Sequence, residues 1–303
     1  MNMDQDQVIN SLNTTNTLLQ TLIEQLTRLE RKHDETNKEL VRLAEHIGGM
    51  RTRVSMISQM SLVNLRKELQ ELIFSKQLSY LDTLDTIRRD RMSFARFGDG
   101  EFLLISDYER HLRFQRNSPS LQDDLAEVLS VPSSNLLVGL PDRSQSLHWE
   151  RVWPRVWPRI EPLIPRGTTF GNADVSRRFC FELHGQDGVQ AWRRIWNDRD
   201  VTLVYGAGSR FSAISELFDG VKSIQRIESK PTNAYSDLDR LETEIRKSDP
   251  DIVLIALGPA ATVLSKRLSE SGIQALDIGH LSSSYAEHFS GGPVPEDSPL
   301  ARQ

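Results

Sequence analysis

The sequence predicts an α/β protein with a Rossmann-like, doubly wound and mostly parallel sheet, preceded by an α-helical coiled coil. In the N-terminal part, apolar residues recur at alternating spacings of four and three, which is the heptad spacing of coiled coils. From about Leu78 onward, short apolar runs alternate with helical stretches, as in a parallel sheet covered by helices. We therefore predict an oligomerisation segment over residues 1–75, an α/β domain over 76–290 and a disordered tail over 291–303.

The heptad segment presents a narrow apolar stripe, which needs a second helix to cover it. The stripe consists of Val8, Leu12, Thr15, Leu19, Leu22, Leu26, Leu29, His33, Thr36, Leu40, Leu43, Ile47, Met50, Val54 and Ile57. The pattern then continues one position over, at Leu62, Leu65, Leu69 and Leu72. Gly48 and Gly49 interrupt the repeat and predict a kink, because each costs about 1 kcal/mol relative to alanine in a helix. We expect a homodimer or homotrimer.

The α/β part is expected to alternate between strands and helices, and runs such as Ile252–Leu257 are apolar on both faces, as in buried parallel strands. The predicted strands are 93–97, 135–140, 201–205, 223–227, 251–257 and 274–278. The predicted helices are 78–90, 119–130, 146–160, 173–184, 188–196, 210–218, 235–248 and 260–271. The predicted helix 146–160 contains Trp149, Trp153 and Trp157. We expect these rings to pack against the sheet rather than to form a platform on which a sugar stacks.

Composition narrows the class of protein. The net charge of −5 and the pI near 5.9 argue against a nucleic-acid partner. Cys180 is the single cysteine, so neither a disulfide framework nor a cysteine zinc site is expected. The first residues lack a secretory signal, and no apolar run approaches the ~20 residues of a membrane helix. We expect a cytoplasmic protein without a transmembrane segment, any membrane contact being peripheral.

Ligands of such sheets bind outside the carboxyl ends of the strands. Asp99-Gly100-Glu101 follows the first predicted strand, and its two carboxylates suit Mg²⁺ or Mn²⁺. Arg96, just before, is placed to contact a phosphate. An Asp-x-Glu alone is more often a solvated acidic turn. Its position on a loop after a buried-type strand favours the ligand role.

Glycine turns follow the later strands, at Gly206-Ala207-Gly208-Ser209-Arg210 and at Gly258. Glycines let backbone amides approach a ligand, and the N-terminus of a following helix suits phosphate. The Gly206-x-Gly208 turn lacks the third glycine of a dinucleotide fingerprint. It is equally compatible with a methyltransferase-like turn, a dehydrogenase-like turn or a plain connection.

Asp277-Ile278-Gly279-His280 ends the last predicted strand. A histidine there could be a general base, a phosphate ligand or a simple cap of the strand. Asp277 could orient His280 or pair with an arginine. Arg177 is a candidate phosphate clamp, whereas Arg178 is expected on a solvated helix face.

Several segments in one order along residues 78–290 resemble those of the GT-D-fold glycosyltransferases, long described as a domain of unknown function. They are Ser93–Glu101, Leu136–Asp142, Thr169–Asn172, Ser223–Ile227, Asn233–Ser236, Leu257–Leu264 and Gln274–His280. The resemblance implies a nucleoside diphosphate sugar as donor and a Mn²⁺ or Mg²⁺ ion at Asp99 and Glu101. The turn at residues 205–210 and the segment 281–285 lack acidic residues that relatives tend to carry. The donor sugar is therefore not carried over.

The residues and the resemblance together predict a metal-dependent transfer of a hexose to an acceptor hydroxyl on a glycan or glycoprotein. The donor is expected to contact Arg96, Gly98, Gly206, Gly208, Ser209, Arg210, Arg177, Asn233 and Gly258. If the reaction inverts configuration, His280 or Asp277 would activate the acceptor. The alternatives are a non-catalytic, nucleotide-binding coiled-coil scaffold and, ranked lower, a Rossmann-like methyltransferase using the turn at 206–209.

Overall fold

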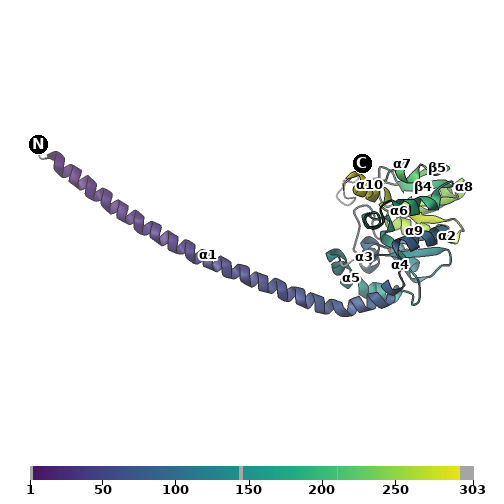
Figure 1. Ribbon diagram of the computed structural model, residues 1–303, viewed down its shortest axis with the longest axis horizontal. Coiled ribbons are helices and arrows are strands. Elements are labelled where there is room, and N and C mark those ends of the chain that lie inside the picture. The colour runs from purple at the N-terminus through teal and green to yellow at the C-terminus, as the bar shows by residue number, and fades with distance from the viewer. Residues whose placement is uncertain (1–2, 143–145, 210, 294–303) are drawn as a thin grey trace. The chain divides into compact units, whose positions relative to one another are not determined.

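A computed structural model describes the backbone of residues 3–142, 146–209 and 211–293 (Figure 1). The chain divides into two units, Met1–Val63 and Asn64–Gln303. Most of the predicted C-terminal tail, from residue 294, lies outside the described residues. None of the helices in the described ranges combines the length and the apolar composition that crossing a bilayer requires.

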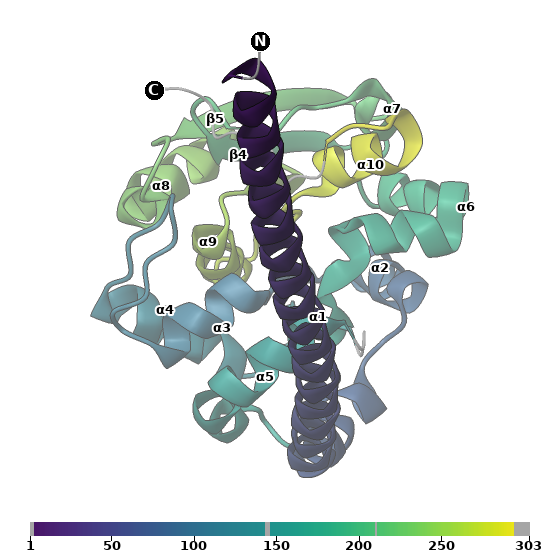
Figure 2. The ribbon, with the colours of Figure 1, turned by 90° about the vertical axis from the view of Figure 1, so that its left-hand side faces the viewer.

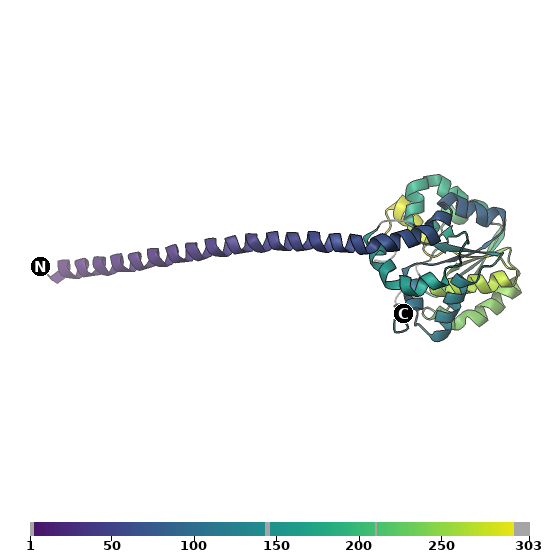
Figure 3. The same cartoon turned by 90° about the horizontal axis from the view of Figure 1, so that it is seen from below.

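The first unit is formed by helix α1 (Met3–Leu72), which continues into the second unit. The helix runs without interruption through Gly48 and Gly49, so the predicted kink is wrong (Figure 3). Two glycines in a helix of this length weaken it by about 2 kcal/mol but remove none of its hydrogen bonds. The predicted stripe is exposed along α1, at Leu12, Leu19, Leu22, Leu26, Leu29, Leu40, Leu43, Ile47, Met50, Val54 and Ile57.

The last turns of α1 belong to the α/β unit and pack against it. Leu69 is buried, and Leu65 and Leu72 are partly buried against the same core cluster. Trp157 Nε1 donates a hydrogen bond to Glu68 Oε2 at 2.6 Å. The one-position shift of the leucine pattern, predicted as an irregularity of a supercoil, thus leads into residues that face the domain's own core.

Within the described part of the chain, seven parallel strands form one sheet in the order β3-β2-β1-β7-β6-β4-β5. The strands are β1 (Ser93–Arg96), β2 (Leu136–Leu140), β3 (Gly171–Asn172), β4 (Asp200–Gly206), β5 (Ser223–Ser229), β6 (Ile252–Ala256) and β7 (Ala275–Asp277). Every predicted strand is present close to its predicted bounds, which confirms the predicted α/β fold. The two-residue β3 was not predicted, because it is too short to show an apolar run.

Helices cover both faces of the sheet (Figure 2), and a hydrophobic cluster lies on each face. One face is covered by α3 (Asp99–Ser106), α4 (Pro119–Ser130), α5 (Leu147–Ile160), α8 (Leu238–Ser248) and α9 (Pro259–Glu270). The other is covered by α2 (Tyr80–Arg89), α6 (Arg178–Trp196), α7 (Ser215–Phe218) and α10 (Leu281–Ser290). Trp153 and Trp157 are buried in the first cluster, which confirms their predicted packing role.

Some helices differ from the prediction. Helices α3 and α10 were not predicted, and the helix expected over 210–218 is limited to α7. The helix expected over 173–184 begins as the 3₁₀ helix η3 (Ala173–Ser176), and α6 then continues to Trp196 with a non-helical residue at Gly185. Shorter 3₁₀ turns are η1 (Phe74–Lys76), η2 (Glu161–Leu163) and η4 (Ala234–Asp237).

The neighbouring strands β1 and β7 are a topological switch point. Helix α3, which follows β1, packs on the first face of the sheet through Phe102 and Leu104. Helix α10, which follows β7, packs on the opposite face through Leu281 and Tyr285. In doubly wound sheets, ligands bind in the crevice where the connections of two adjacent strands diverge in this way. The fold therefore directs attention to the residues directly after β1 and β7.

Candidate active site

Asp99 and Glu101 lie in the first turn of α3, not on the loop that the sequence predicted. Gly98 is the N-cap residue, and its backbone N–H donates a hydrogen bond to Glu101 Oε2 at 2.7 Å. This hydrogen bond closes the first turn of the helix, which begins directly after Gly98. Carboxylates are also stabilised at a helix N-terminus by the helix dipole.

Glu101 sits in an environment that disfavours its charge. Burial raises the pKa of its carboxyl group to about 7. The Gly98 N–H acts in the opposite direction and the nearby Asp277 carboxylate reinforces the rise. Glu101 is therefore held in place by the helix cap, in surroundings that favour its protonated form more than water does.

Asp99 is the more accessible of the two acids, with 43% of its side chain exposed. Its Oδ2 lies 3.2 Å from Nε2 of His148, in the first turn of α5. His148 is a site residue that the sequence did not suggest, since it is distant in sequence and belongs to no recognised motif. The pair brings the N-terminal turns of α3 and α5 together.

Arg96, at the end of β1, is largely surrounded by protein groups. Its Nη1 donates to Ala173 O at 3.1 Å and to Ser176 Oγ, and its Nε lies 3.5 Å from Asp277 Oδ1. A Cβ atom on Gly279 would overlap the guanidinium, so the two residues are in direct contact. Arg96 therefore joins the carboxyl end of β1 to that of β7 and to η3, rather than facing outward as a phosphate ligand.

Asp277 and His280, the two predicted base candidates, lie at different depths. The Asp277 side chain is 4% exposed, accepts a hydrogen bond from Gly279 N at 3.0 Å and pairs with Arg96. Burial raises the pKa of Asp277, and the Arg96 charge opposes this rise. His280 is partly exposed and is the N-cap residue of α10. Of the two, His280 is the one within reach of a ligand in the crevice.

A second acidic cluster follows β2 and β3. Tyr80 donates a hydrogen bond from its hydroxyl to Asp142 Oδ2 at 3.0 Å, and Asp142 N donates to Asp174 Oδ2 at 3.1 Å. Burial raises the pKa of Asp174, against the effect of Asp142 N–H and the charges of Arg177 and Arg96. Of these residues, the sequence had singled out Arg177 and Arg96. The apolar run ending at Leu140 was the available signal for Asp142.

The glycine turn after β4 is closed by its own hydrogen bonds. Ala207 N donates to Ser229 O at 2.8 Å, and Ser209 N donates to Gly206 O at 2.9 Å. Gly208 has a φ of 64°, which a glycine adopts without strain. The next helix, α7, begins only at Ser215, so the predicted helix N-terminus is absent from this turn. Arg210 lies outside the described residues.

Asn233 and Gly258 both contact the loop between α3 and α4. Asn233 Oδ1 accepts a hydrogen bond from Arg116 N at 2.8 Å, and Asn233 N donates to Phe114 O at 2.8 Å. Gly258 has a φ of 57°, and a Cβ atom there would lie 2.6 Å from Phe114 Cε2. The Asn233 side chain therefore holds the loop, and Gly258 leaves space for the Phe114 ring.

The geometry can now be compared with known proteins. A family model of the glycosyltransferase GT-D fold matches residues 94–293. The chain belongs to the GT-D-fold glycosyltransferase family. The matched range contains all seven strands apart from the first residue of β1, and all the candidate site residues, from Arg96 to His280. The resemblance seen in the sequence is thereby confirmed.

Two curated relatives are similar to this GT-D member. It is 32% identical to a probable glycosyl transferase Gly of Streptococcus gordonii over 222 residues, which covers 69% of this chain and 32% of the relative. It is 30% identical to the glycosyltransferase GlyD of Streptococcus pneumoniae serotype 4 over 256 residues, or 78% of this chain and 31% of that protein. The chain thus spans about a third of the length of these relatives.

Solved structures are similar to the GT-D member in fold. One, described as a highly conserved domain of unknown function 1792 with a distinct glycosyltransferase fold, has a TM-score of 0.67 and 27% identity. The match covers 74% of this chain and 84% of that one. A new glycosyltransferase of the same domain type from Streptococcus sanguinis has a TM-score of 0.65 and 30% identity, covering 73% and 86%.

The GT-D site offers the carboxylates of Asp99 and Glu101 to a divalent cation. Among the described residues, no group of three or more histidine, cysteine or carboxylate side chains could hold a metal by itself. Mg²⁺ commonly uses one or two carboxylates together with substrate phosphates and waters. Asp99 and Glu101 supply two carboxylates, but residues two apart on a helix do not face each other, and Glu101 Oε2 is already hydrogen-bonded to Gly98 N.

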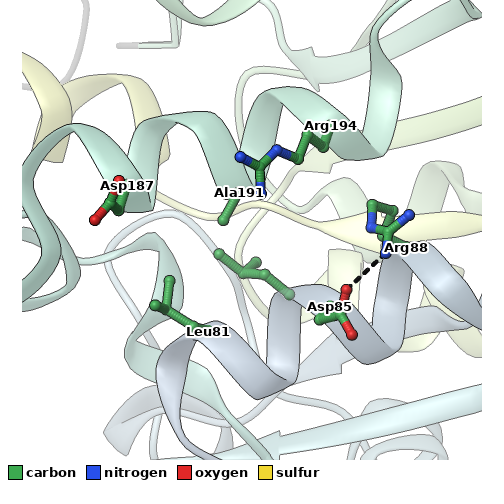
Figure 4. A pocket seen from close by; sticks show the side chains of 7 residues that line it. Leu81, Asp85, Arg88, Asp187, Ala191 and Arg194 are labelled. Atoms are coloured by element: carbon green, nitrogen blue, oxygen red, sulfur yellow. Dashed lines mark hydrogen bonds and ion pairs between the residues drawn. The ribbon is translucent and has the colours of Figure 1, made fainter.

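A groove of about 230 Å³ elsewhere in the domain is not part of this site. It lies between α2 and α6 and is lined by Asp85, Arg88, Asp187 and Arg194, among others (Figure 4). Both helices end a few residues before the next strand begins, so Arg88 and Arg194 lie near the amino ends of the strands. The residues that follow β1 and β7 are at the opposite edge of the sheet.

Proposed function

We propose that this GT-D member transfers a hexose from a nucleoside diphosphate sugar to a hydroxyl group of a glycan or glycoprotein, with Mn²⁺ or Mg²⁺ bound at Asp99 and Glu101. The observation that carries the proposal is the switch point between β1 and β7, where Asp99 begins α3 and His280 is the N-cap residue of α10. Ligands of doubly wound sheets bind in such crevices.

The charge of the first turn of α3 supports the need for a cation. A helix N-terminus by itself attracts phosphate. Here the turn begins with two carboxylates, Asp99 and Glu101, which repel a diphosphate. Asp99 and Glu101 would hold a divalent cation, whose charge, when bound, would offset this repulsion and the negative charge that develops on the leaving group.

The acceptor oxygen forms a bond to the anomeric carbon while the bond to the diphosphate breaks, and the hydroxyl proton must go to a base. We assign that role to His280, because it is partly exposed at the crevice. Asp277 acts as a positioning residue, since its carboxylate is engaged by Gly279 N and Arg96. A His280→Gln variant is expected to lose kcat while its KM for the donor stays close to wild type.

The metal role is tested with Asp99→Asn and Glu101→Gln in a donor-hydrolysis assay, run with and without Mn²⁺. Loss of electrostatic stabilisation of a transition state typically lowers rates by about 10²–10³-fold. We expect both variants to lose metal-dependent turnover on that order, whereas Asp85→Asn, at the amino edge of the sheet, should retain it. Full metal-dependent turnover in both site variants would reject the assignment.

Assembly through α1 is a second proposal. Its apolar stripe is exposed along the described helix, and a second copy of the chain would cover it in a homo-oligomer. A scaffold without catalysis would share this feature. A melting screen with nucleotide sugars and Mn²⁺, followed by the donor-hydrolysis assay, separates the two, because a nucleotide-binding scaffold would be stabilised by the donor without turning it over.

The methyltransferase alternative has little support from the turn at residues 206–209. The Ala207 and Ser209 amides are bonded within the protein, and no helix begins there. Binding of S-adenosylmethionine in preference to every nucleotide sugar in the same screen would restore it.

A further inference from the structure

The loop between α3 and α4 contains a basic segment, Arg110–Arg116, which we call the basic loop. It contacts three turns at the carboxyl edge of the sheet. Leu112 lies 3.3 Å from where a Gly100 Cβ would be, after β1, and Phe114 lies against Gly258, after β6. Asn233, after β5, donates its backbone N–H to Phe114 O. The basic loop therefore lies at the carboxyl edge of the sheet, next to the start of α9.

Buried amide side chains fix the conformation of the basic loop. Gln115 is 3% exposed; its Nε2 donates to Arg116 O at 2.9 Å and its Oε1 accepts from Tyr235 N at 3.2 Å. Asn117, just after the loop, is 8% exposed and donates from Nδ2 to Leu104 O at 2.9 Å. A loop held in this way loses little further entropy when a ligand binds.

The side chains that the basic loop exposes are cationic and aromatic. Arg110, Arg113 and Arg116 are exposed, and Phe114 is 37% exposed. Within the described ranges, none of the three guanidinium groups forms an ion pair or hydrogen bond. Other arginines do: Arg240 pairs with Asp237 and Glu244. The exposed basic groups are thus available to an anion.

We propose that the basic loop binds the nucleoside diphosphate part of the donor, with Arg113 and Arg116 on the phosphates and Phe114 stacked on the base. This rests on the proposed function, because it assigns the donor's nucleotide to the loop. Guanidinium groups bind phosphate through two parallel hydrogen bonds. An aromatic face stacks on any nucleobase. The basic loop thus offers cationic groups and an aromatic ring close together in the sequence, which suits a ligand that is both anionic and aromatic.

The test is calorimetric titration of the full chain with UDP, GDP, ADP, CDP and dTDP in the presence of Mn²⁺. For the diphosphate that the wild type binds, Arg113→Gln and Arg116→Gln should each weaken binding roughly tenfold or more, as expected for a charge-assisted hydrogen bond. Their affinities should also fall less steeply with added KCl than that of the wild type.

Phe114→Leu should weaken binding of the same diphosphate but leave its dependence on KCl unchanged, and Phe114→Tyr, which keeps the ring, should retain the wild-type affinity. Arg194→Gln removes an exposed arginine at the amino edge of the sheet and is expected to bind like the wild type. Melting curves of all variants establish that they are folded.

The outcomes distinguish this inference from the proposed function. Binding by the wild type with unchanged affinity in Arg113→Gln, Arg116→Gln and Phe114→Leu would overturn the role of the basic loop and leave the glycosyltransferase proposal in place. Failure of the wild type to bind any of the five diphosphates would contradict both.

Discussion

Arg96 links three parts of the carboxyl edge through one guanidinium group. It contacts Asp277 after β7 and Ala173 and Ser176 in η3, while its own residue ends β1. The sequence placed Arg96 correctly at the strand end, but a strand-end arginine facing a ligand and one facing its neighbours have the same sequence signature. The contacts that decide between them come from segments about 80 and 180 residues away.

Gly279 is expected to be intolerant of a side chain. A Cβ atom there would overlap Arg96 Nη2, and the residue has a φ of 45°. Gly279→Ala should lower the free energy of unfolding by roughly 2–3 kcal/mol, about 1–2 of it from the left-handed backbone. Chemical denaturation measures the effect.

Gly272→Ala is the matched control, because Gly272 also has a positive φ, 78°, but open space around its Cβ position. It should show the backbone penalty alone. If Gly279→Ala and Gly272→Ala were equally destabilising, the close contact between Gly279 and Arg96 would have no energetic weight.

At the level of helices and strands, the sequence was informative where segments were long and regular. The heptads of α1 and the apolar runs of β4 and β6 were recognised close to their bounds. Helix α3 was missed because Asp99-Gly100 resembles a turn and the following Phe102–Ile105 is buried at every position, which hides any helical period. Helix α10 begins with Leu281 and three serines, which are poor helix formers.

The two glycines of helix α1 destabilise it, and alanine at both positions should remove this effect. Gly48 and Gly49 have helical geometry, and nothing lies within 4 Å of their Cβ positions. The double substitution Gly48→Ala/Gly49→Ala should therefore stabilise the helix by about 2 kcal/mol. Thermal melting followed by circular dichroism at 222 nm should show the helical signal persisting to higher temperature.

Gly185→Ala is a comparison variant for which the opposite effect on stability is expected. Gly185 is also open at its Cβ position, but its φ of 50° interrupts α6. Alanine there should destabilise the domain by about 1–2 kcal/mol. A loss of stability in the Gly48→Ala/Gly49→Ala variant would mean that the helix bends at these residues.

For the whole molecule, the order of the strands was beyond the reach of the sequence. Alternation of strand and helix predicted a parallel sheet, yet the pairing of β1 with β7 joins segments about 180 residues apart. For the same reason, the sequence did not show which residues meet in the site. Asp99 and His280 were each proposed from local motifs, but their common crevice follows from that pairing, and His148 and Asp174 enter only through tertiary contacts.

Assembly through α1 predicts that substitutions at two adjacent residues have different effects on the oligomeric state. Leu40 lies in the apolar stripe, whereas Val41 lies outside it, and both are similarly exposed, at 57% and 59%. In the full chain, Leu40→Glu should shift the mass measured by light scattering toward the monomer, because a charge in the seam of a coiled coil is unfavourable. Val41→Glu should leave the mass unchanged. A monomeric wild type, or equal effects of the two substitutions, would contradict assembly through this stripe.

The cap formed by Glu101 has a consequence for how metal binding could be observed. The Gly98 amide is hydrogen-bonded to Glu101 Oε2 at 2.7 Å, and a bonded amide exchanges its proton with solvent slowly. If the carboxylate turned from the cap toward a cation, that amide would lose its acceptor. We expect the Gly98 amide signal in a nuclear magnetic resonance spectrum to exchange faster with deuterium when Mg²⁺ and a nucleoside diphosphate are added together. A single backbone proton would then report on the occupancy of the site.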